Sequence, residues 1–120
     1  MDNIDSKLLS LSKSKFRSSF HLRRYMIDYI NDKSINVIKE HAYDFINKRI
    51  KPKYIENDGF QTPMKGHPVF IAQHATGTCC RNCLYKWHHI EKNKELNDME
   101  VDYIVNIIMK WIMNEYNNSL

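Results

Sequence analysis

The chain has 120 residues, a length that fits one domain and allows a core without the help of disulfides. Hydrophobic residues make up 42% of the chain and charged residues 27%, which excludes an intrinsically disordered or collagen-like protein. The net charge is +4, but residues 1–57 alone carry 12 basic and 7 acidic side chains. The charge is therefore concentrated in the N-terminal half.

The chain opens without the basic start and apolar run of a signal peptide. Its most apolar stretch, 101–113, is too short to cross a bilayer. We therefore expect a cytoplasmic protein with no membrane partner. In a reducing compartment, three cysteines within five positions indicate thiol or metal chemistry rather than a disulfide framework.

Residues 1–18 are predicted to form a basic N-terminal arm, and residues 19–117 a single all-α domain of four to five helices. The first clear apolar periodicity predicts a helix over 20–30, after the candidate caps Ser18 and Ser19. Strand signals are weak throughout the sequence.

A second helix is predicted from Ser34, its cap, to Ile50, because Lys51-Pro52 prevents its continuation. Residues 51–66 show no periodicity and contain turn signals, so they are expected to form a long loop. The apolar and aromatic members of this loop favour an ordered segment packed on the body: Tyr54, Ile55, Phe60 and Met64.

Two short helices are predicted after the loop. Pro68 suits the first turn of one, and Gly77 suits the left-handed residue that closes it. Thr78 is expected to cap the other, over 79–88. The last helix is predicted over 98–116. Asn97 and Glu100 form a capping box at its start, and its apolar stripe belongs in the core: Val101, Ile104, Val105, Ile108 and Ile112.

The residues best suited to chemistry lie in the two short helices. His74 ends the first, and Cys79, Cys80 and Cys83 share one face at the start of the second. One imidazole and two or three thiolates suit tetrahedral zinc, the cofactor that we predict. The predicted ligands are His74, Cys80 and Cys83, with Cys79 the preferred fourth. Because adjacent helical side chains diverge by about 100°, binding by both Cys79 and Cys80 would strain a single tetrahedral site. Other histidines are alternative ligands: His41, His67 and His88.

Two other interpretations of the cysteines stay open. They could be small, buried and inert residues on an apolar face. Alternatively, Cys80 and Cys83 could form a redox pair in which Arg81 lowers a thiol pKa, although the βαβ context typical of such a pair is missing.

The remaining polar candidates each have a structural and a functional interpretation. His41 could bond a carbonyl at the core boundary or act as a general base. His67 could cap the helix that follows it or bind an anion there. Asp58 and Gln61 could position substrate or activate water near a metal, but turn capping by Asp58 and carbonyl pairing by Gln61 are favoured.

The basic run between positions 7 and 24 contains no acidic residue and suggests contact with phosphate, since neutralised phosphates release counterions. Its candidate nucleic-acid contacts are Lys13, Lys15, Arg17, Arg23 and Arg24. A solvated N-terminus is the simpler alternative.

A longer motif surrounds the cysteines. It reads Asn57-Asp58-Gly59, Gln61-Thr62-Pro63-Met64, Gly66-His67-Pro68-Val69-Phe70, Ala72-Gln73-His74-Ala75-Thr76, Thr78-Cys79-Cys80-Arg81, Cys83-Leu84 and Lys86-Trp87-His88. With it the sequence resembles a bacterial family of small proteins, the domain of unknown function 4186 family, over about residues 15–113. The resemblance implies no known activity. It implies that the segment chosen here for its chemistry is also the family's signature.

These observations favour a small zinc-binding module whose basic half contacts nucleic acid. The alternative is a small metal-dependent hydrolase or a thiol redox enzyme that uses the loop 57–66 with the His/Cys segment. The sequence assigns neither catalytic residues nor an oligomeric state.

Overall fold

The computed structural model describes residues 3–120, which form six α-helices and one 3-10 helix, with no strand among these residues. In chain order the elements are α1 (Ile4–Ser12), η1 (Arg17–Ser19), α2 (Arg24–Lys33), α3 (Ile35–Arg49), α4 (Pro68–Thr76), α5 (Arg81–His88) and α6 (Asp98–Asn118). The prediction of an all-α fold is confirmed, with one α-helix more than expected. None of the helices in this range is long and apolar enough to span a bilayer.

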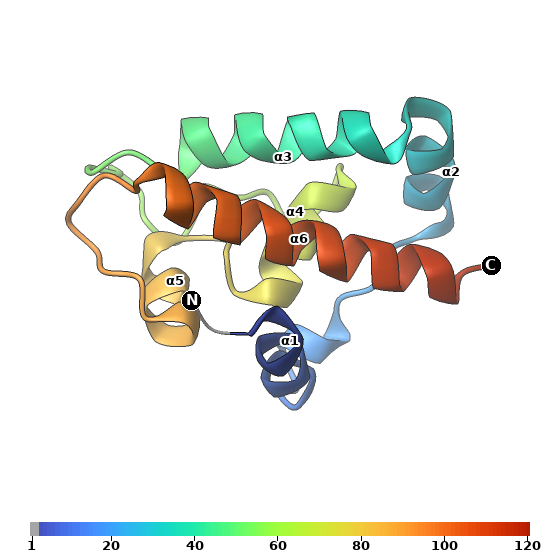
Figure 1. Cartoon of the computed structure of the whole chain (residues 1–120), viewed down its shortest axis with the longest axis horizontal. Coiled ribbons are helices and arrows are strands. Elements are labelled where there is room, and N and C mark those ends of the chain that lie inside the picture. The colour runs from blue at the N-terminus through green and yellow to red at the C-terminus, as the bar shows by residue number, and fades with distance from the viewer. Residues whose placement is uncertain (1–2) are drawn as a thin grey trace.

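The two longest helices, α3 and α6, run antiparallel beside each other, and α4 crosses behind α6 (Figure 1). All nine residues of α4 are buried, because α6, α3, α1 and η1 all contact this helix. The described part of the predicted N-terminal arm therefore folds into α1 and η1, which pack on the body. Helix α4 is the centre of the molecule.

The apolar stripe predicted for α6 is confirmed: Val101, Ile104, Val105, Ile108 and Ile112 are all buried. They form the core with α3 and α4, where Ile38, Ala42, Ile46, Val69 and Ala72 are fully buried. The capping box at the start of α6 is also present, since Asn97 and Glu100 bond each other's backbone N–H groups. Sequence periodicity thus predicted the largest interface of the fold.

Helix α3 begins as predicted, with the Ser34 side chain accepting a hydrogen bond from the N–H of Val37. Helix α2 does not: it begins at Arg24, four residues later than expected, and Ser18 and Ser19 belong to η1 instead. The chain between η1 and α2 is extended, and the Leu22 N–H donates to the Glu115 carboxylate at 2.9 Å. A contact with α6 thus holds the residues that local periodicity assigned to a helix.

The segment after α3 is irregular up to His67, as predicted, but three of the four apolar residues expected to pack on the body are exposed, and only Ile55 is half-buried. Tyr54 is 79% exposed and Phe60 83% exposed, and Met64 is also exposed. The loop is instead held by polar contacts, such as the bond from the Thr62 hydroxyl to the carbonyl of Cys79 at 2.7 Å. The prediction that apolar packing orders this loop is therefore wrong for Tyr54, Phe60 and Met64.

Candidate metal centre

Residues 67–81 form one uninterrupted buried segment that contains α4 and the turn leading to α5. Gly77 closes α4 at φ 69°, ψ 29°, as predicted for a left-handed residue. A β-carbon added at Gly77 would lie 2.8 Å from Cδ1 of Trp87, so α4 and α5 meet closely at this turn. The turn leads directly from α4 to Cys79 and Cys80, the two residues before α5.

Helix α5 begins at Arg81 and not at Cys79 as predicted. Cys80 is its N-cap, with extended backbone angles (φ −161°, ψ 167°), and its sulfur accepts a hydrogen bond from the N–H of Cys83 at 3.3 Å. Thr78, the predicted cap, lies two residues earlier. Because Cys79 and Cys80 both precede the first helical residue, the divergence of adjacent helical side chains does not apply to them.

The three sulfur atoms converge. The Cys83 sulfur lies 3.1 Å from that of Cys80 and 3.6 Å from that of Cys79, and all three lie within 4.8 Å of one another. Among residues 3–120, no His, Cys, Asp or Glu joins the three cysteines as a fourth donor within 4.8 Å of all three sulfurs. Cys79 and Cys80 are buried and Cys83 is half-buried, so the cluster lies at the edge of the core.

Arg17 completes the cluster from η1. Its guanidinium donates to the Cys83 sulfur at 3.1 Å, to the Cys79 sulfur at 3.5 Å and to the His74 carbonyl at 2.7 Å. Only 8% of Arg17 is exposed. A buried cation against two sulfurs favours thiolate, the form of cysteine that binds metals and attacks electrophiles.

The pKa values of the cluster follow from these contacts. Hydrogen bonds from Cys79 and Cys80, followed by those from Arg17, hold the pKa of Cys83 far below its usual range. Bonds to the neighbouring sulfurs and burial raise the pKa of Cys80. Burial lowers the pKa of Arg17, but its bonds to Cys79 and Cys83 outweigh this and raise it. These contacts favour the thiolate at Cys83, beside the Arg17 cation, over thiolate at Cys80.

Buried polar side chains fix the backbone that carries the cysteines. The Gln73 amide donates to the Thr78 carbonyl at 3.2 Å, and Thr62 bonds the Cys79 carbonyl. Asp58 accepts the first N–H of α5, that of Arg81, at 3.0 Å. The positions of the sulfurs are therefore set by the loop and by α4 as well as by α5.

His74, the predicted imidazole ligand, does not join the cysteines. Its Nε2 lies 3.0 Å from the Pro63 carbonyl, and its ring stacks on Phe20 with centroids 5.4 Å apart. Burial lowers its pKa, which favours the neutral ring. Its backbone does serve the cluster, since the His74 carbonyl accepts from Arg17.

The other histidines lie in separate environments. His67 caps α4, as one of its two interpretations predicted: its Nδ1 accepts from the Val69 N–H at 3.0 Å. The Nε2 of His67 lies 3.0 Å from Nδ1 of His41. His88 bonds the Tyr103 hydroxyl at 2.8 Å and the Thr76 carbonyl at 2.7 Å. None of the three belongs to the sulfur group.

The redox interpretation expected Arg81 to lower a thiol pKa, but its side chain bonds elsewhere. Its buried guanidinium donates to four backbone carbonyls, those of Ile50, Pro52, Glu91 and Lys94, at 2.8–3.3 Å. It therefore ties the loops around α5 together. Asp58 accepts from the Gln61 amide and from the Arg81 N–H, so it ties the loop to the start of α5. Gln61 bonds the Asp58 carboxylate and the Gly59 N–H rather than the predicted carbonyl.

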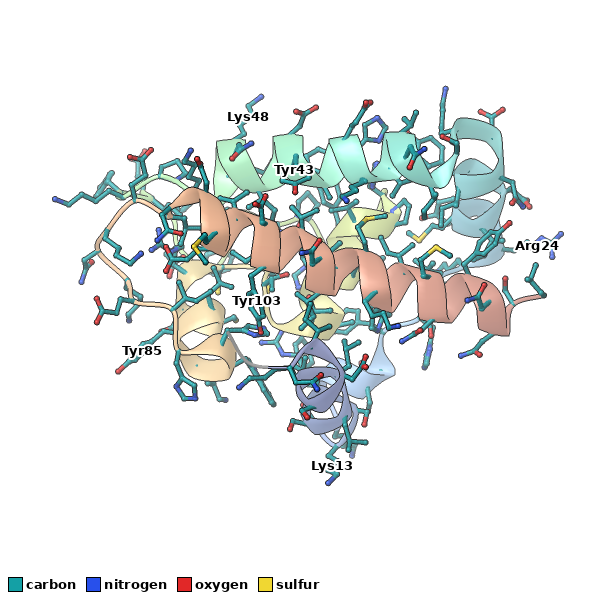
Figure 2. The ribbon with its side chains drawn as sticks, viewed as in Figure 1. Lys13, Arg24, Tyr43, Lys48, Tyr85 and Tyr103 are labelled. Carbon is teal, nitrogen blue, oxygen red and sulfur yellow. The ribbon has the colours of Figure 1, made fainter. Side chains whose placement is uncertain are left out.

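Two cations of the basic run lie well apart. Lys13, the residue after α1, is at the lower edge of the molecule, and Arg24, the first residue of α2, is at its right edge (Figure 2). Arg24 pairs with Asp28 at 3.3 Å, while Lys13, Lys15 and Arg23 are exposed. Arg17 is buried against the sulfurs, so it is not available to a phosphate. Nucleic-acid contact by the other four cations stays a prediction.

A family model described as a domain of unknown function (DUF4186) matches residues 5–113. The resemblance found in the sequence is thereby confirmed over nearly the whole chain. No solved structure matches the chain.

Proposed function

The chain belongs to the domain of unknown function 4186 family, a description that carries no activity, and we propose that it is a metal-binding module that holds zinc through Cys79, Cys80 and Cys83. The observation that carries this proposal is the convergence of three sulfurs, two of which accept hydrogen bonds from one buried cation. Thiolates suit zinc, and zinc accepts them with tetrahedral geometry.

The spacing of the sulfurs supports the proposal. With Zn–S bonds of about 2.3 Å, two ligands of a tetrahedral zinc are about 3.8 Å apart. The separation of the Cys79 and Cys83 sulfurs, 3.6 Å, is close to that value, and the 3.1 Å between Cys80 and Cys83 needs only a small rotation to match it. The donor set is therefore nearly preformed.

The charges also support it. A zinc ion with three thiolates has a net charge of −1, and Arg17 supplies +1 beside them. A buried ionic site costs much less when its charges cancel and its hydrogen bonds are made. Three protein donors leave the fourth position for water. Asp58 and Gln61 bond each other and backbone N–H groups, and they have no role at the metal in this proposal.

Titration of the full chain with zinc against a chromophoric chelator tests the proposal. We expect one zinc per chain, and substitution of any one of the cysteines by serine to weaken binding by about 100-fold or more. The exposed His89→Ala variant is the control and should bind like the wild type. The His74→Gln variant should also keep its zinc, because the His74 ring bonds the Pro63 carbonyl. A wild type that competes no better than its Cys83→Ser variant would refute the metal site.

A second function, thiol–disulfide exchange, is favoured by one observation: the sulfurs of Cys80 and Cys83 are only 3.1 Å apart. A Cys-x-x-Cys pair with one stabilised thiolate has the chemistry of a redox dithiol, in which two thiols lose two hydrogens to an acceptor disulfide. In this structure the activating cation is Arg17, from a distant part of the chain.

Equilibration of the metal-free chain with glutathione buffers tests this second function. A Cys80–Cys83 disulfide, seen as a mass loss of 2 Da on one peptide, should form reversibly in the wild type and in the Cys79→Ser variant. Failure to form it under oxidising glutathione would exclude the redox function and leave the metal proposal untouched.

A further inference from the structure

A cleft of about 590 Å³ lies between the start of α2 and the loop that precedes α4. It contains none of the cysteines. Its walls include two cations, Arg23 and Lys65, two aromatic rings, Phe20 and Tyr25, and the hydroxyl-bearing Ser19. No carboxylate from the part of the chain that the structure describes lines it. Its volume lies within the range of about 300–1,000 Å³ that is typical of small-molecule sites.

The two rings have different roles. Phe20 is held in place, because it stacks on His74 and meets Phe16 edge to face at 5.1 Å between centroids. Tyr25 is 53% exposed at the start of α2. A large aromatic ring exposed in the wall of a cleft is suited to stack with a planar ligand.

The charges indicate the other part of the ligand. Arg23 and Lys65 come from different segments and are both exposed in the same cleft. His21 also lines it, but its Nδ1 lies 3.3 Å from the Glu115 carboxylate, so we assign it no part in binding. Helix α2 starts here with no side-chain cap and no acidic residue in its first turn, which adds to the positive potential. Two cations without a carboxylate favour an anion with several oxygens, such as phosphate.

We propose that this cleft binds a nucleoside monophosphate unit, with the base stacked against Tyr25 and the phosphate between Arg23 and Lys65. An aromatic base joined to a phosphate can contact the exposed ring and the two cations at the same time. The unit could be a free nucleotide or one residue of a single strand, which offer the same chemistry. This site is independent of the proposed metal.

Calorimetric titration of the full chain with AMP, adenosine, inorganic phosphate and a single-stranded oligonucleotide tests the proposal. AMP or the oligonucleotide should bind, and adenosine and phosphate should each bind at least about 10-fold more weakly, since each lacks one half of the recognition. If AMP binds, the ligand is a free nucleotide; if only the oligonucleotide binds, it is a nucleotide within a strand.

Variants at the cleft assign the binding to it. Arg23→Gln, Lys65→Gln and Tyr25→Leu should each lower the affinity by about 10-fold or more, because each removes a charge or the stacking ring. Lys33→Gln is the matched control: it removes an exposed cation from the last turn of the same helix, which pairs with Asp32 and does not line the cleft, and should stay within about twofold of the wild type. The proposal is overturned if neither AMP nor the oligonucleotide binds, if adenosine binds as tightly as AMP, or if Lys33→Gln loses as much affinity as Arg23→Gln.

Discussion

Arg17 is the residue on which the properties of the cysteine cluster depend. Leaving a guanidinium only 8% exposed is costly unless its hydrogen bonds are made, and here two sulfurs and the His74 carbonyl accept them. In the sequence Arg17 belongs to a basic run and looks like a phosphate contact. Nothing local distinguishes it from Lys15, because its partners lie 57–66 positions away.

Replacing Arg17 by methionine should weaken zinc binding by about 10- to 100-fold, because hydrogen bonds to a charged group contribute about 1.5–3 kcal/mol. Arg17→Lys keeps the charge without the planar fork and should lie between methionine and the wild type. Lys15→Met, an exposed change in the same run, is the control. Equal zinc affinities of Arg17→Met and the wild type in chelator competition would show that the guanidinium does not support the metal.

The pair His41–His67 is a second place where single atoms matter. The Val69 N–H occupies Nδ1 of His67, so a neutral His67 carries its proton on Nε2 and donates it to Nδ1 of His41. Protonating either ring disrupts one of these two bonds. Burial, together with the charge of His41, lowers the pKa of His67 to about 4.

The stability of the fold should therefore fall as the pH is lowered from about 6.5 toward 4. In that range the unfolded chain binds a proton at His67 that the folded chain does not, and the loss approaches about 3 kcal/mol at the acid end. His67→Asn keeps a side chain that can cap α4 but does not titrate. The free energy of unfolding, measured in urea at several pH values, should therefore fall more steeply with decreasing pH in the wild type than in this variant. If the two proteins lose stability in parallel, His67 is not the source of the pH dependence.

Among the elements, α6 shows where sequence periodicity is reliable and α5 shows where it is not. The stripe and capping box of α6 depend on residues within the helix itself, so they could be predicted. The start of α5 depends on Asp58 and Thr62, which come from the preceding loop, and on Gln73 of α4. These contacts hold Cys79 and Cys80 outside the helix, which no local pattern indicates.

Truncation of Ile108 to alanine should cost about 2–5 kcal/mol, since this side chain is fully buried where α6 meets the core. The exposed Lys110→Ala, on the face of α6 opposite the stripe, should change stability by no more than about 0.5 kcal/mol. The shift of the denaturant midpoint, multiplied by an unchanged m-value, gives the change in stability for each variant. An unmoved midpoint for Ile108→Ala would mean that this face of α6 is not in the core.

Cys80 has two roles that can be separated. As the N-cap of α5 its sulfur accepts the Cys83 N–H, and serine can do the same, whereas alanine cannot. In metal-free protein, Cys80→Ala should be less stable than Cys80→Ser by about 1 kcal/mol. Both variants should lose zinc. If the two variants unfold at the same denaturant concentration with chelator present, the cap contributes nothing.

At the scale of the whole molecule, the cysteine cluster is assembled from parts of the chain that are far apart. The sulfurs come from the turn before α5 and from its first turn, the cation from η1, and the backbone supports from α4 and the loop. The segment that carries the chemistry could be identified from the sequence, because its cysteines are close together there. Arg17 could not. The two short helices predict His74 beside the cysteines, but the contacts of its ring with Pro63 and Phe20, which no local pattern indicates, hold it elsewhere.

The exposed loop shows the limit of composition as a guide. Tyr54 and Phe60 predicted apolar packing, yet polar bonds order the loop and leave both rings in solvent. Apolar side chains indicate burial only on average, because much of any protein surface is apolar. The position of these residues depended on the bonds of Asp58, Gln61 and Thr62 to backbone groups.

X-ray absorption spectroscopy of the zinc-loaded chain tests the central claim most directly, since it reads the ligands of the metal itself. We predict three sulfur atoms at about 2.3 Å and one nitrogen or oxygen atom at about 2.0–2.1 Å. A shell of nitrogen and oxygen alone, or one with a single sulfur, would contradict a zinc site formed by Cys79, Cys80 and Cys83.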